Sequence, residues 1–551
     1  MRRCISPGLV AAITAVAVAC LTPIAGAKVL LVGTYHGHKG QYKTIEAAVK
    51  KAKPGDWILV APGDYKTKTS EFAPGSGGQF PAGVMITTPR VTLRGMNRNT
   101  VIVDGTTKGA ACNDNPSDQN FGPVTAKNQP PDLSGAGLNG VEVWKARNVS
   151  VENLTACNFL GGTGGDGGTG NEIWWNGGAN SGKIGGWNYY GAYLNATSTF
   201  YPPDTSQTQT QREQSAAEYG IFSSNWDGGT WINTYASNMN DSGYYIGACQ
   251  QECNQVINNA WAEFNALGYS GSNSGGSLVI ENSKFDQNED GFDTNSQNGD
   301  NPPPQNGECP NGGTSPITHT HSCWVFIHNI SENNNNPNVP AAGSAAAGPV
   351  GTGMSISGGR FDTVMDNTFQ DDNAWGNILV PYPDSGPPCT GGTPNYPLLG
   401  SGSCLYDEWG DAIIDNHYID DGSYGNPTNG DFEELNFQSG EPNDCFSGNT
   451  DASGHLNTDS QQLEDEYPTC SGNQSVANTN PTFLTQVLCD SQVQIDGSDT
   501  CTSPTQYPRF TNINNGLHPL PSTSQLPTMP NPCKGVPKNA FCTVTKKKHK
   551  K

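Results

Sequence analysis

Short apolar runs bounded by glycine, asparagine and aspartate dominate the hydrophobic pattern of this chain. In the stretch from Ser277 to Gln297, the apolar run Leu278 to Ile280 is followed by Phe285 and a carboxylate-rich turn that ends at Gly291. Apolar runs of this length between turn residues predict β-strands. The composition agrees: glycine (68 residues) and proline (39) are abundant and only 15% of the residues are charged, which disfavours long helices.

The same frame of residues recurs along the chain. Asn282 is followed six residues later by Asn288 and nine residues later by Gly291. An internal repeat of this kind predicts a solenoid of stacked rungs. Asparagine suits the corners of such rungs, because it tolerates a left-handed backbone and can form ladders with its neighbours. The other copies are Asn259–Asn265–Gly268, Asn367–Asn373–Gly376, and the weaker Thr234–Asn240–Gly243, Asn329–Asn335–Asn338 and Asn416–Gly422–Gly425.

Three insertions lengthen the later repeats, at residues 298–320, 336–350 and 383–406. In this frame all three follow the same corner of the rung. Insertions at one corner of a solenoid project from one side, which is often the binding face. We therefore expect long loops on one side of the molecule, and a functional site beside them.

The N-terminal part carries an export signal and a short helix. Residues 1–27 combine Arg2 and Arg3 with an apolar run and a small-residue cleavage site, which predicts a signal peptide and a secreted protein. Lipoprotein anchoring at Cys20 is the alternative. No other segment is apolar enough to cross a membrane. A helix is expected where Thr44, as N-cap, precedes an apolar stripe of Ile45, Ala48, Val49 and Ala52.

Fourteen of the 16 cysteines lie beyond the signal. An even number in an exported chain favours disulfides. Proximity in sequence suggests Cys249 with Cys253, Cys309 with Cys323, and Cys389 with Cys404, with the full connectivity left open.

The run from Tyr42 to Tyr65 resembles the opening of secreted right-handed parallel β-helix proteins of the pectin-lyase-like superfamily. This resemblance implies an all-β, single-stranded right-handed parallel β-helix with a short N-terminal capping helix. Residues 291–297, 334–340 and 380–384 also resemble an exported actinobacterial group of β-helix-repeat proteins with no settled activity. We expect the β-helix to cover residues 28–430 and a Cys-rich irregular region with a basic tail to cover residues 431–551.

The segment from Asn288 to Asp293 looks like the N-T-D-G-x-D segment of polygalacturonases. That likeness makes Asp290 and Asp293 candidate catalytic acids for glycosidic bond hydrolysis, which needs paired carboxyl groups. The structural alternative is that asparagine and glycine here only mark the corner of a rung.

Calcium is a second interpretation of the same stretch. Asp286, Asn288 and Asp290 alternate as in a D-x-N-x-D-G calcium loop, although Gln297 replaces the usual glutamate and no helices flank the loop. Polysaccharide lyases of the superfamily use calcium with an arginine or lysine base, so Arg360 is the candidate base. Its alternative role is an ion pair with Asp362.

A second candidate cluster surrounds the third insertion. Carboxylates lie close to aromatic residues there, as in a sugar cleft that combines acid–base groups with stacking planes. Solvated loop acids are the alternative. The candidates are Asp384, Asp407 and Glu408, with Asp411 nearby, as acids, and Tyr382, Trp409 and Trp375 as substrate-binding aromatics.

The formal net charge of −22 makes nucleic acid an unsuitable partner. We expect an exported, monomeric, carbohydrate-active protein that binds and cleaves or epimerises an extracellular polysaccharide, as a lyase or glycoside hydrolase. The alternative is a non-catalytic envelope or adhesion protein that is tethered to the cell wall by its basic C-terminus.

Overall fold

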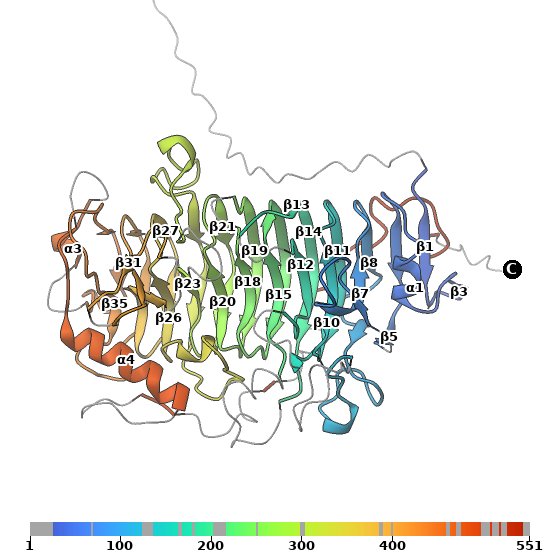
Figure 1. The fold of residues 1–551 in the computed structure, drawn as a ribbon, viewed down its shortest axis with the longest axis horizontal. Coiled ribbons are helices and arrows are strands. Elements are labelled where there is room, and N and C mark those ends of the chain that lie inside the picture. Colours follow the sequence, from blue (N-terminus) through green and yellow to red (C-terminus); the bar gives the residue numbers. More distant parts are fainter. Residues whose placement is uncertain are drawn as a thin grey trace, which may run out of the picture.

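The computed structural model describes residues 26–67, 70–123, 136–162, 168–178, 182–201, 216–249, 252–297, 304–384, 389–397, 400–458, 463–469, 475–496, 507–509, 517–518 and 526–543. The strands stack into an elongated right-handed parallel β-helix (Figure 1). Each complete rung contributes two consecutive strand segments to a 19-stranded sheet and one segment to an 11-stranded sheet. The predicted fold class is confirmed.

The 19-stranded sheet consists of parallel pairs. Its strands are β1 (Val29–Val32), β4 (Trp57–Val60), β5 (Gly63–Lys66), β8 (Thr92–Gly95), β9 (Val101–Asp104), β11 (Val149–Cys157), β14 (Tyr189–Thr197), β17 (Gly229–Ser237), β19 (Gln255–Glu263), β21 (Leu278–Glu281), β22 (Lys284–Asp286), β24 (Trp324–Ile327), β25 (Ile330–Glu332), β27 (Asp362–Met365), β28 (Thr368–Gln370), β33 (Ala412–Ile414), β34 (His417–Ile419), β36 (Cys445–Ser447) and β37 (Thr450–Asp451).

The 11-stranded sheet is parallel except where its first two strands pair. Its strands are β6 (Glu71–Phe72), β7 (Pro81–Ile86), β10 (Asn139–Trp144), β12 (Ile173–Asn176), β15 (Tyr219–Ser224), β18 (Ser242–Gly247), β20 (Leu267–Ser272), β23 (Asp293–Asn295), β26 (Thr352–Ser357), β29 (Trp375–Val380) and β35 (Gly430–Glu434).

Small sheets and short helices decorate this solenoid. They are β2 (Thr34–Tyr35) with β3 (His38–Lys39), β13 (Gly186–Trp187) with β16 (Trp226–Asp227), β30 (Tyr382–Asp384) with β31 (Thr393–Pro394) and β32 (Cys404–Tyr406), the helices α1 (Ile45–Val49), α3 (Leu463–Glu466) and α4 (Pro481–Asp496), and the 3-10 turns η1 (Pro116–Asp118), η3 (Pro310–Gly312) and η4 (Ala345–Ala347).

The core runs along the solenoid axis. Apolar side chains of successive rungs stack on one another, as Trp231, Ile257, Ile280 and Phe326 do, and they are fully buried. Burying such columns is the main favourable term that holds a solenoid together. At the N-terminal end, the buried face of α1 joins this core and the Thr44 hydroxyl accepts a hydrogen bond from the Ala47 N–H, as the sequence predicts.

Asparagine ladders stabilise two corners of the rungs. In one, the amide of Asn329 and its backbone N–H both donate to Asn367 Oδ1, and Asn367 bonds Asn416 in the same way. Ser283 occupies the equivalent position one rung earlier, where its N–H donates to Asn329. Asn282 is therefore not the ladder residue. It is the left-handed residue just before it, with φ 53°.

The repeat frame from the sequence is thus displaced by one residue at this corner. The glycine column also differs from the prediction. A Cβ on Gly291 would strike the carbonyl oxygen of Gly353, so Gly353 rather than Asn338 is its counterpart in the next rung. The second insertion separates these two glycines in sequence, which explains why spacing alone misassigned the column.

The three insertions leave the rung at two corners rather than one. Those at residues 298–320 and 383–406 follow strands of the 11-stranded sheet, β23 and β29. The insertion at 336–350 precedes β26 of the same sheet. The long loops therefore border one sheet at both ends of its strands, which corrects the expectation that all three leave the rung at a single corner.

The C-terminal part continues the solenoid before it folds back. β36 and β37 pair with β33 and β34, so parallel pairing extends beyond the boundary that the sequence suggested after residue 430. α4 then packs beside η4 (Figure 1). Residues 526–543 lie at the opposite end of the molecule, where Arg94 donates to the carbonyl oxygens of Pro532 and Lys534.

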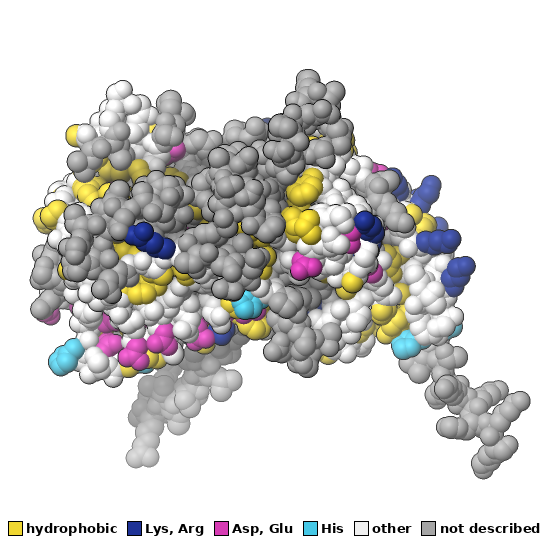
Figure 2. Space-filling model, turned by 90° about the horizontal axis from the view of Figure 1, so that it is seen from below, with side chains coloured by type: hydrophobic (Ala, Val, Ile, Leu, Met, Phe, Trp, Pro, Cys, Tyr) yellow, Lys and Arg dark blue, Asp and Glu magenta, His cyan; other side chains and the backbone are white. Residues whose placement is uncertain are grey.

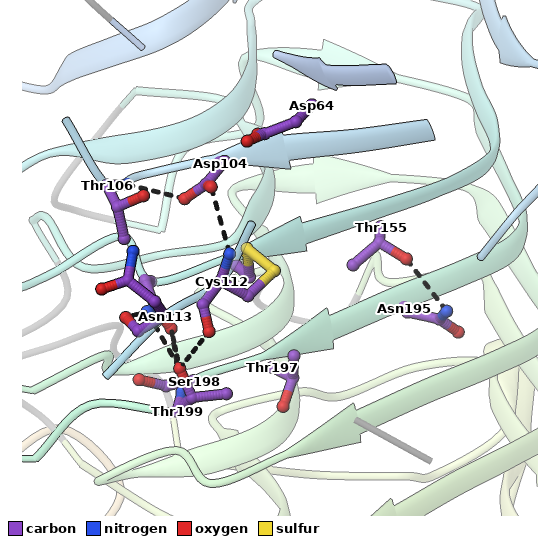
Figure 3. The surroundings of a disulfide bond; sticks show 12 residues. Asp64, Asp104, Thr106, Cys112, Asn113, Thr155, Asn195, Thr197, Ser198 and Thr199 are labelled. Carbon is purple, nitrogen blue, oxygen red and sulfur yellow. Dashed lines mark hydrogen bonds between the residues drawn. A yellow bond between two sulfur atoms is a disulfide. The ribbon is translucent and has the colours of Figure 1, made fainter. Parts of the chain in front are cut away.

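Disulfides fasten several loops to the rungs. The three pairs suggested by sequence proximity are all present, together with Cys112–Cys157 and Cys533–Cys542. Figure 3 shows how Cys112–Cys157 joins the loop after β9 to β11, beside Asp104, which accepts hydrogen bonds from the Thr106 and Cys112 N–H groups. Disulfides are consistent with an oxidising, extracellular location.

Most of the predicted signal peptide, with Cys20, and the basic tail at residues 546–551 lie outside the described residues. Within the described ranges, no helix is long and apolar enough to span a membrane.

Candidate functional site

A groove of about 1080 Å³ runs along the outer face of the 11-stranded sheet. Because parallel strands in register stack equivalent residues, two columns of side chains form its floor. The first column is Trp174, Phe222, Tyr245, Ser270, Asp293, Ser355 and Ile378. The second column is Trp144, Asn176, Ser224, Ser272, Asn295, Ser357 and Val380.

The chemistry of the floor changes along the groove. Toward the N-terminal end, the Trp174 and Phe222 rings stack with centroids 4.8 Å apart, and Tyr245 meets Phe222 edge-on at 4.9 Å. These rings are only 3–6% exposed. Hydroxyl, amide and carboxyl groups occupy the middle, and the aliphatic Ile378 and Val380 follow. The lining of the groove is therefore aromatic at one end, polar in the middle and aliphatic at the other end.

The insertions supply the walls. Residues 344–349 of the second insertion reach the groove where strands of the sheet begin, and α4 adds Leu484 and Val487 beside them. Tyr382, just before the third insertion, and Leu405 within it reach the groove where the strands end. Neither wall is placed by a single rung, so the site exists only when the insertions fold against the stacked sheet.

Asp293 lies at the centre of the floor and is half-buried. Its carboxylate accepts hydrogen bonds from Asn295 Nδ2 (2.6 Å), Ser357 Oγ (2.8 Å) and Ser355 Oγ (2.8 Å). These donors fix its orientation and favour its charged form. Burial acts in the opposite direction and raises the pKa of Asp293 above its usual range.

Asp290 lies behind this carboxylate and is fully buried. Its Oδ2 is 2.9 Å from Ser355 Oγ, and its Oδ1 accepts a hydrogen bond from the Phe292 N–H. Burial, followed by the nearby charge of Asp293, raises the pKa of Asp290 well above its usual range. The structure thus brings together the two acids that the sequence singled out, through a serine that it did not.

The three residues of the calcium hypothesis do not converge. Asp286 pairs with Lys284 (2.8 Å) and accepts from Trp261 Nε1 (2.6 Å). Asn288 belongs to an asparagine ladder, and Asp290 bonds Ser355 as described. Among the described residues, no group of three or more His, Cys, Asp or Glu side chains is placed to hold a metal ion. The spacing that resembled a calcium loop is explained by three separate structural roles.

Arg360 does not line the groove. Its guanidinium lies over the Trp409 ring, 3.6 Å from the centroid, and donates to the carbonyl oxygens of Asp407 (3.2 Å) and Gly391 (2.8 Å). Burial lowers the pKa of Arg360 to about 10. Asp362 instead bonds Gln305, so the suggested Asp362 ion pair is absent. Trp409 and Arg360 stabilise the third insertion rather than facing a ligand.

The acids near Trp409 are interior groups. Asp407 and Glu408 are fully buried, as is the neighbouring Asp411. Burial raises the pKa of Asp407 to about 7 and that of Glu408 well above its usual range. None of the three lines the groove. They are therefore neither solvated loop acids nor groups within reach of a ligand there.

The aromatic residues that the sequence predicts as substrate-binding lie in different environments. Tyr382 lines the groove, and its hydroxyl accepts a hydrogen bond from Gln297 Nε2 (2.7 Å). Trp375 is fully buried, donates to the Thr428 carbonyl (2.6 Å) and packs against Phe483 of α4. Asp384, at the end of β30, does not line the groove.

Sequence reasoning missed most of the floor. Ser355 and Ser357 come from the strand that follows the second insertion, and Phe222 and Tyr245 from two earlier rungs. The signal that could have found them is alternation within each short strand, since Ser355 and Ser357 are two residues apart and point to the same face. Without the register, that alternation does not say which strand lies beside Asp293.

No protein-family model and no curated protein sequence matches this chain. Among solved structures, the A-module of mannuronan C-5 epimerase AlgE6 from Azotobacter vinelandii is similar, with a TM-score of 0.43, 14% identity, and coverage of 74% of this chain and 88% of that one. A PL6 alginate lyase in complex with a trisaccharide has a TM-score of 0.35, 13% identity, and coverage of 76% and 77%. Pectate lyase Pel9A has a TM-score of 0.29, 14% identity, and coverage of 62% and 71%. Likeness at this level carries no information about the site, and the functional conclusion rests on the groove.

Proposed function

We propose that this protein is an exported glycoside hydrolase that binds a polysaccharide along the groove and uses Asp293 as its acid–base group. The observation that carries the proposal is the position of Asp293, a hydrogen-bonded carboxylate at the centre of a long groove. Aromatic residues can stack on sugar rings, and hydroxyl and amide groups can bond their substituents. Tyr382 and Gln297 border the same section.

The charge of the groove favours a neutral glycan over a uronate polymer. Lys145 is the only basic residue among the described lining residues, and its ammonium lies over the Trp144 ring. Figure 2 shows Lys and Arg side chains gathered toward the N-terminal end of the lower face, with acidic side chains in a row toward the other end. A uronate chain in such a protein would need an added cation. A lyase would also need a base, and Arg360 is engaged elsewhere.

The test is a panel of neutral and uronate polysaccharides incubated with the mature protein, with and without calcium. We expect new reducing ends from a neutral glycan, independent of calcium. Unsaturated products that absorb in the ultraviolet would overturn hydrolysis in favour of a lyase. Binding without any product would favour the non-catalytic envelope protein.

Asp293→Asn supplies the site-specific arm of this test. General acid–base groups contribute roughly 10²–10⁴-fold to rate, so the variant should lose at least about 100-fold in turnover while it still binds the glycan. Asp366→Asn is the matched control, because Asp366 is exposed at a left-handed corner where asparagine is well tolerated. Equal activity of both variants would refute the role of Asp293.

A further inference from the structure

The hydroxyl of Ser355 lies between two carboxyl groups. Its oxygen is 2.9 Å from Asp290 Oδ2 and 2.8 Å from Asp293 Oδ1. A serine hydroxyl carries one hydrogen, and an ionised carboxylate can only accept. Both contacts are hydrogen bonds only if one of the two acids keeps its own proton and donates it to the serine.

The surroundings identify the acid that keeps the proton. Asp293 receives two further side-chain donors, from Asn295 and Ser357, which stabilise a negative charge. Asp290 has no further side-chain donor among the described residues and receives only the Phe292 N–H. It is also the more deeply buried of the two. The resting arrangement is a neutral Asp290 that donates to Ser355, which donates to an ionised Asp293.

The other charged groups around Asp290 act in the same direction. Asp372, from the following rungs, adds negative charge near Asp290. Asp490 of α4 is also buried, and its charge interacts unfavourably with that of Asp290. On the Asp293 side, burial is the main cause that raises the pKa of Tyr269, and the charges of Asp362 and Asp293 add to it. A negative charge on Asp290 is thus opposed by Asp293, by the following rungs and by α4.

We propose that Ser355 relays a proton from the buried Asp290 to Asp293, so that Asp290 is a proton store for the carboxyl group in the groove. In the transfer, the Oδ2–H bond of Asp290 breaks and its proton passes to Ser355 Oγ. The original Ser355 proton passes to Asp293 Oδ1. The products are an Asp290 carboxylate, an unchanged serine hydroxyl and a neutral Asp293 that can protonate a leaving oxygen. The acids around Asp290 then favour return of a proton from the groove by the reverse path.

The use of this relay in turnover rests on the proposed hydrolase function, whereas the shared proton does not. Asp290 and Ser355 are positioning residues, because they act through Asp293 and neither is required to touch the glycan. The shared proton and the hydrolase function can therefore be refuted separately.

The experiment is a pH titration of the aspartate carboxyl carbons by ¹³C NMR in the intact protein, with Asp290→Asn, Asp293→Asn, Ser355→Ala and Ser355→Thr. In the wild type we expect two coupled titration steps. Asp290→Asn should leave a single step for Asp293, because the amide can still donate to Ser355 but carries no transferable proton. Ser355→Ala should raise the pKa of Asp293, since a donor to its charged form is lost, and Ser355→Thr should restore the wild-type curve.

Turnover on whichever glycan of the panel the protein cleaves is the second readout. Asp290→Asn and Ser355→Ala should each lower kcat at least about 10-fold and change the pH profile, with KM little changed. Ser423→Ala, at an exposed serine, is the control. Identical Asp293 titrations in wild type, Asp290→Asn and Ser355→Ala would overturn the relay, whatever the activity. Coupled titrations in a protein that cleaves no glycan would support the shared proton and refute only the hydrolase.

Discussion

Two sets of corner ladders in this solenoid differ in one side-chain atom, which is an amide nitrogen in asparagine and a carboxyl oxygen in aspartate. This difference affects the free energy of unfolding. In the amide ladder of Asn329, Asn367 and Asn416, each side chain accepts at Oδ1 and donates through Nδ2, so every rung is linked to the next. In the acid ladder of Asp362 and Asp411, the backbone N–H of one residue donates to Oδ1 of the next, and the second oxygen of each has no hydrogen-bond partner among the described residues.

A third ladder changes type midway. Asn288 and Asn334 are linked as amides, and Asn334 Nδ2 donates to Asp372 Oδ1 (3.1 Å). Asp372 in turn donates to Asp421 Oδ1 only through its backbone N–H (2.8 Å), because the side chain of an ionised aspartate has no donor. A buried polar atom without a partner costs about 1–3 kcal/mol. Acid ladders can stabilise the stacked rungs as well as amide ladders do only while their carboxyl groups are protonated.

The largest effect is expected when an acid is placed in the amide ladder. Asn367→Asp removes the amide donor to Asn416 Oδ1 and to the Phe326 carbonyl. At pH 8 it should cost about 3 kcal/mol in the free energy of unfolding, because a buried carboxylate replaces two hydrogen bonds. At pH 4.5 the loss should be smaller. Denaturant unfolding at both pH values measures it, with the exposed Asn259→Asp as control. Equal losses at the two pH values would contradict the comparison.

The pH dependence of the wild type is the second prediction. Burial raises the pKa values of Asp362, Asp372 and Asp411 well above their usual range, and that of Asp407 to about 7. With folded pKa values above the unfolded value of about 4, the folded protein binds more protons between them, so stability falls as pH rises. We expect a loss of about 2 kcal/mol between pH 4.5 and 8. Stability that increases over this range would show that the acids are paired in a way the ladders do not allow.

The reverse substitution should have a smaller, stabilising effect. Asp372→Asn converts the mixed ladder to amides, because its Nδ2 could donate to Asp421 Oδ1 as Asn334 donates to Asp372. We expect a gain of about 1 kcal/mol at pH 8 and almost none at pH 4.5. Asp371→Asn, one residue away and partly exposed, should change the unfolding free energy by less than about 0.5 kcal/mol at either pH. An equal change in the unfolding free energy of both variants would show that the position of Asp372 in the ladder does not matter.

The smallest effect concerns two stacked acids that share one partly exposed lysine. Asp286 and Glu332 occupy equivalent positions in adjacent rungs, and Lys284 pairs with both at 2.8 Å. Lys284→Met should cost no more than about 1 kcal/mol, since a partly exposed lysine is screened by water and salt. The loss should disappear at 1 M salt. A salt-independent loss would mean that packing, not charge, sets the contribution of Lys284.

The contrast between residues that stand out within one turn and residues that meet only through strand pairing explains how much of the site the sequence could predict. Asp290 and Asp293 stand out because they are surplus to the rung frame, and Tyr382 because it adjoins an insertion. Ser355 does not stand out, because a serine in a short strand has no signature and reaches Asp293 only through the pairing of β23 with β26. Arg360 and Glu408 have side chains that are suitable for acid–base catalysis, but folding places them in the interior.

By itself, the sequence determined the repeated rungs, the Thr44-capped helix, three local disulfides and the acid-rich turn, because each depends on residues close together in the chain. The tertiary structure decided the ladder register, the counterpart of Gly291, the extension of the solenoid to β37 and the composition of the groove. These depend on which strands stack across insertions of different length. A one-residue change in that register would turn every side chain of a strand to the opposite face.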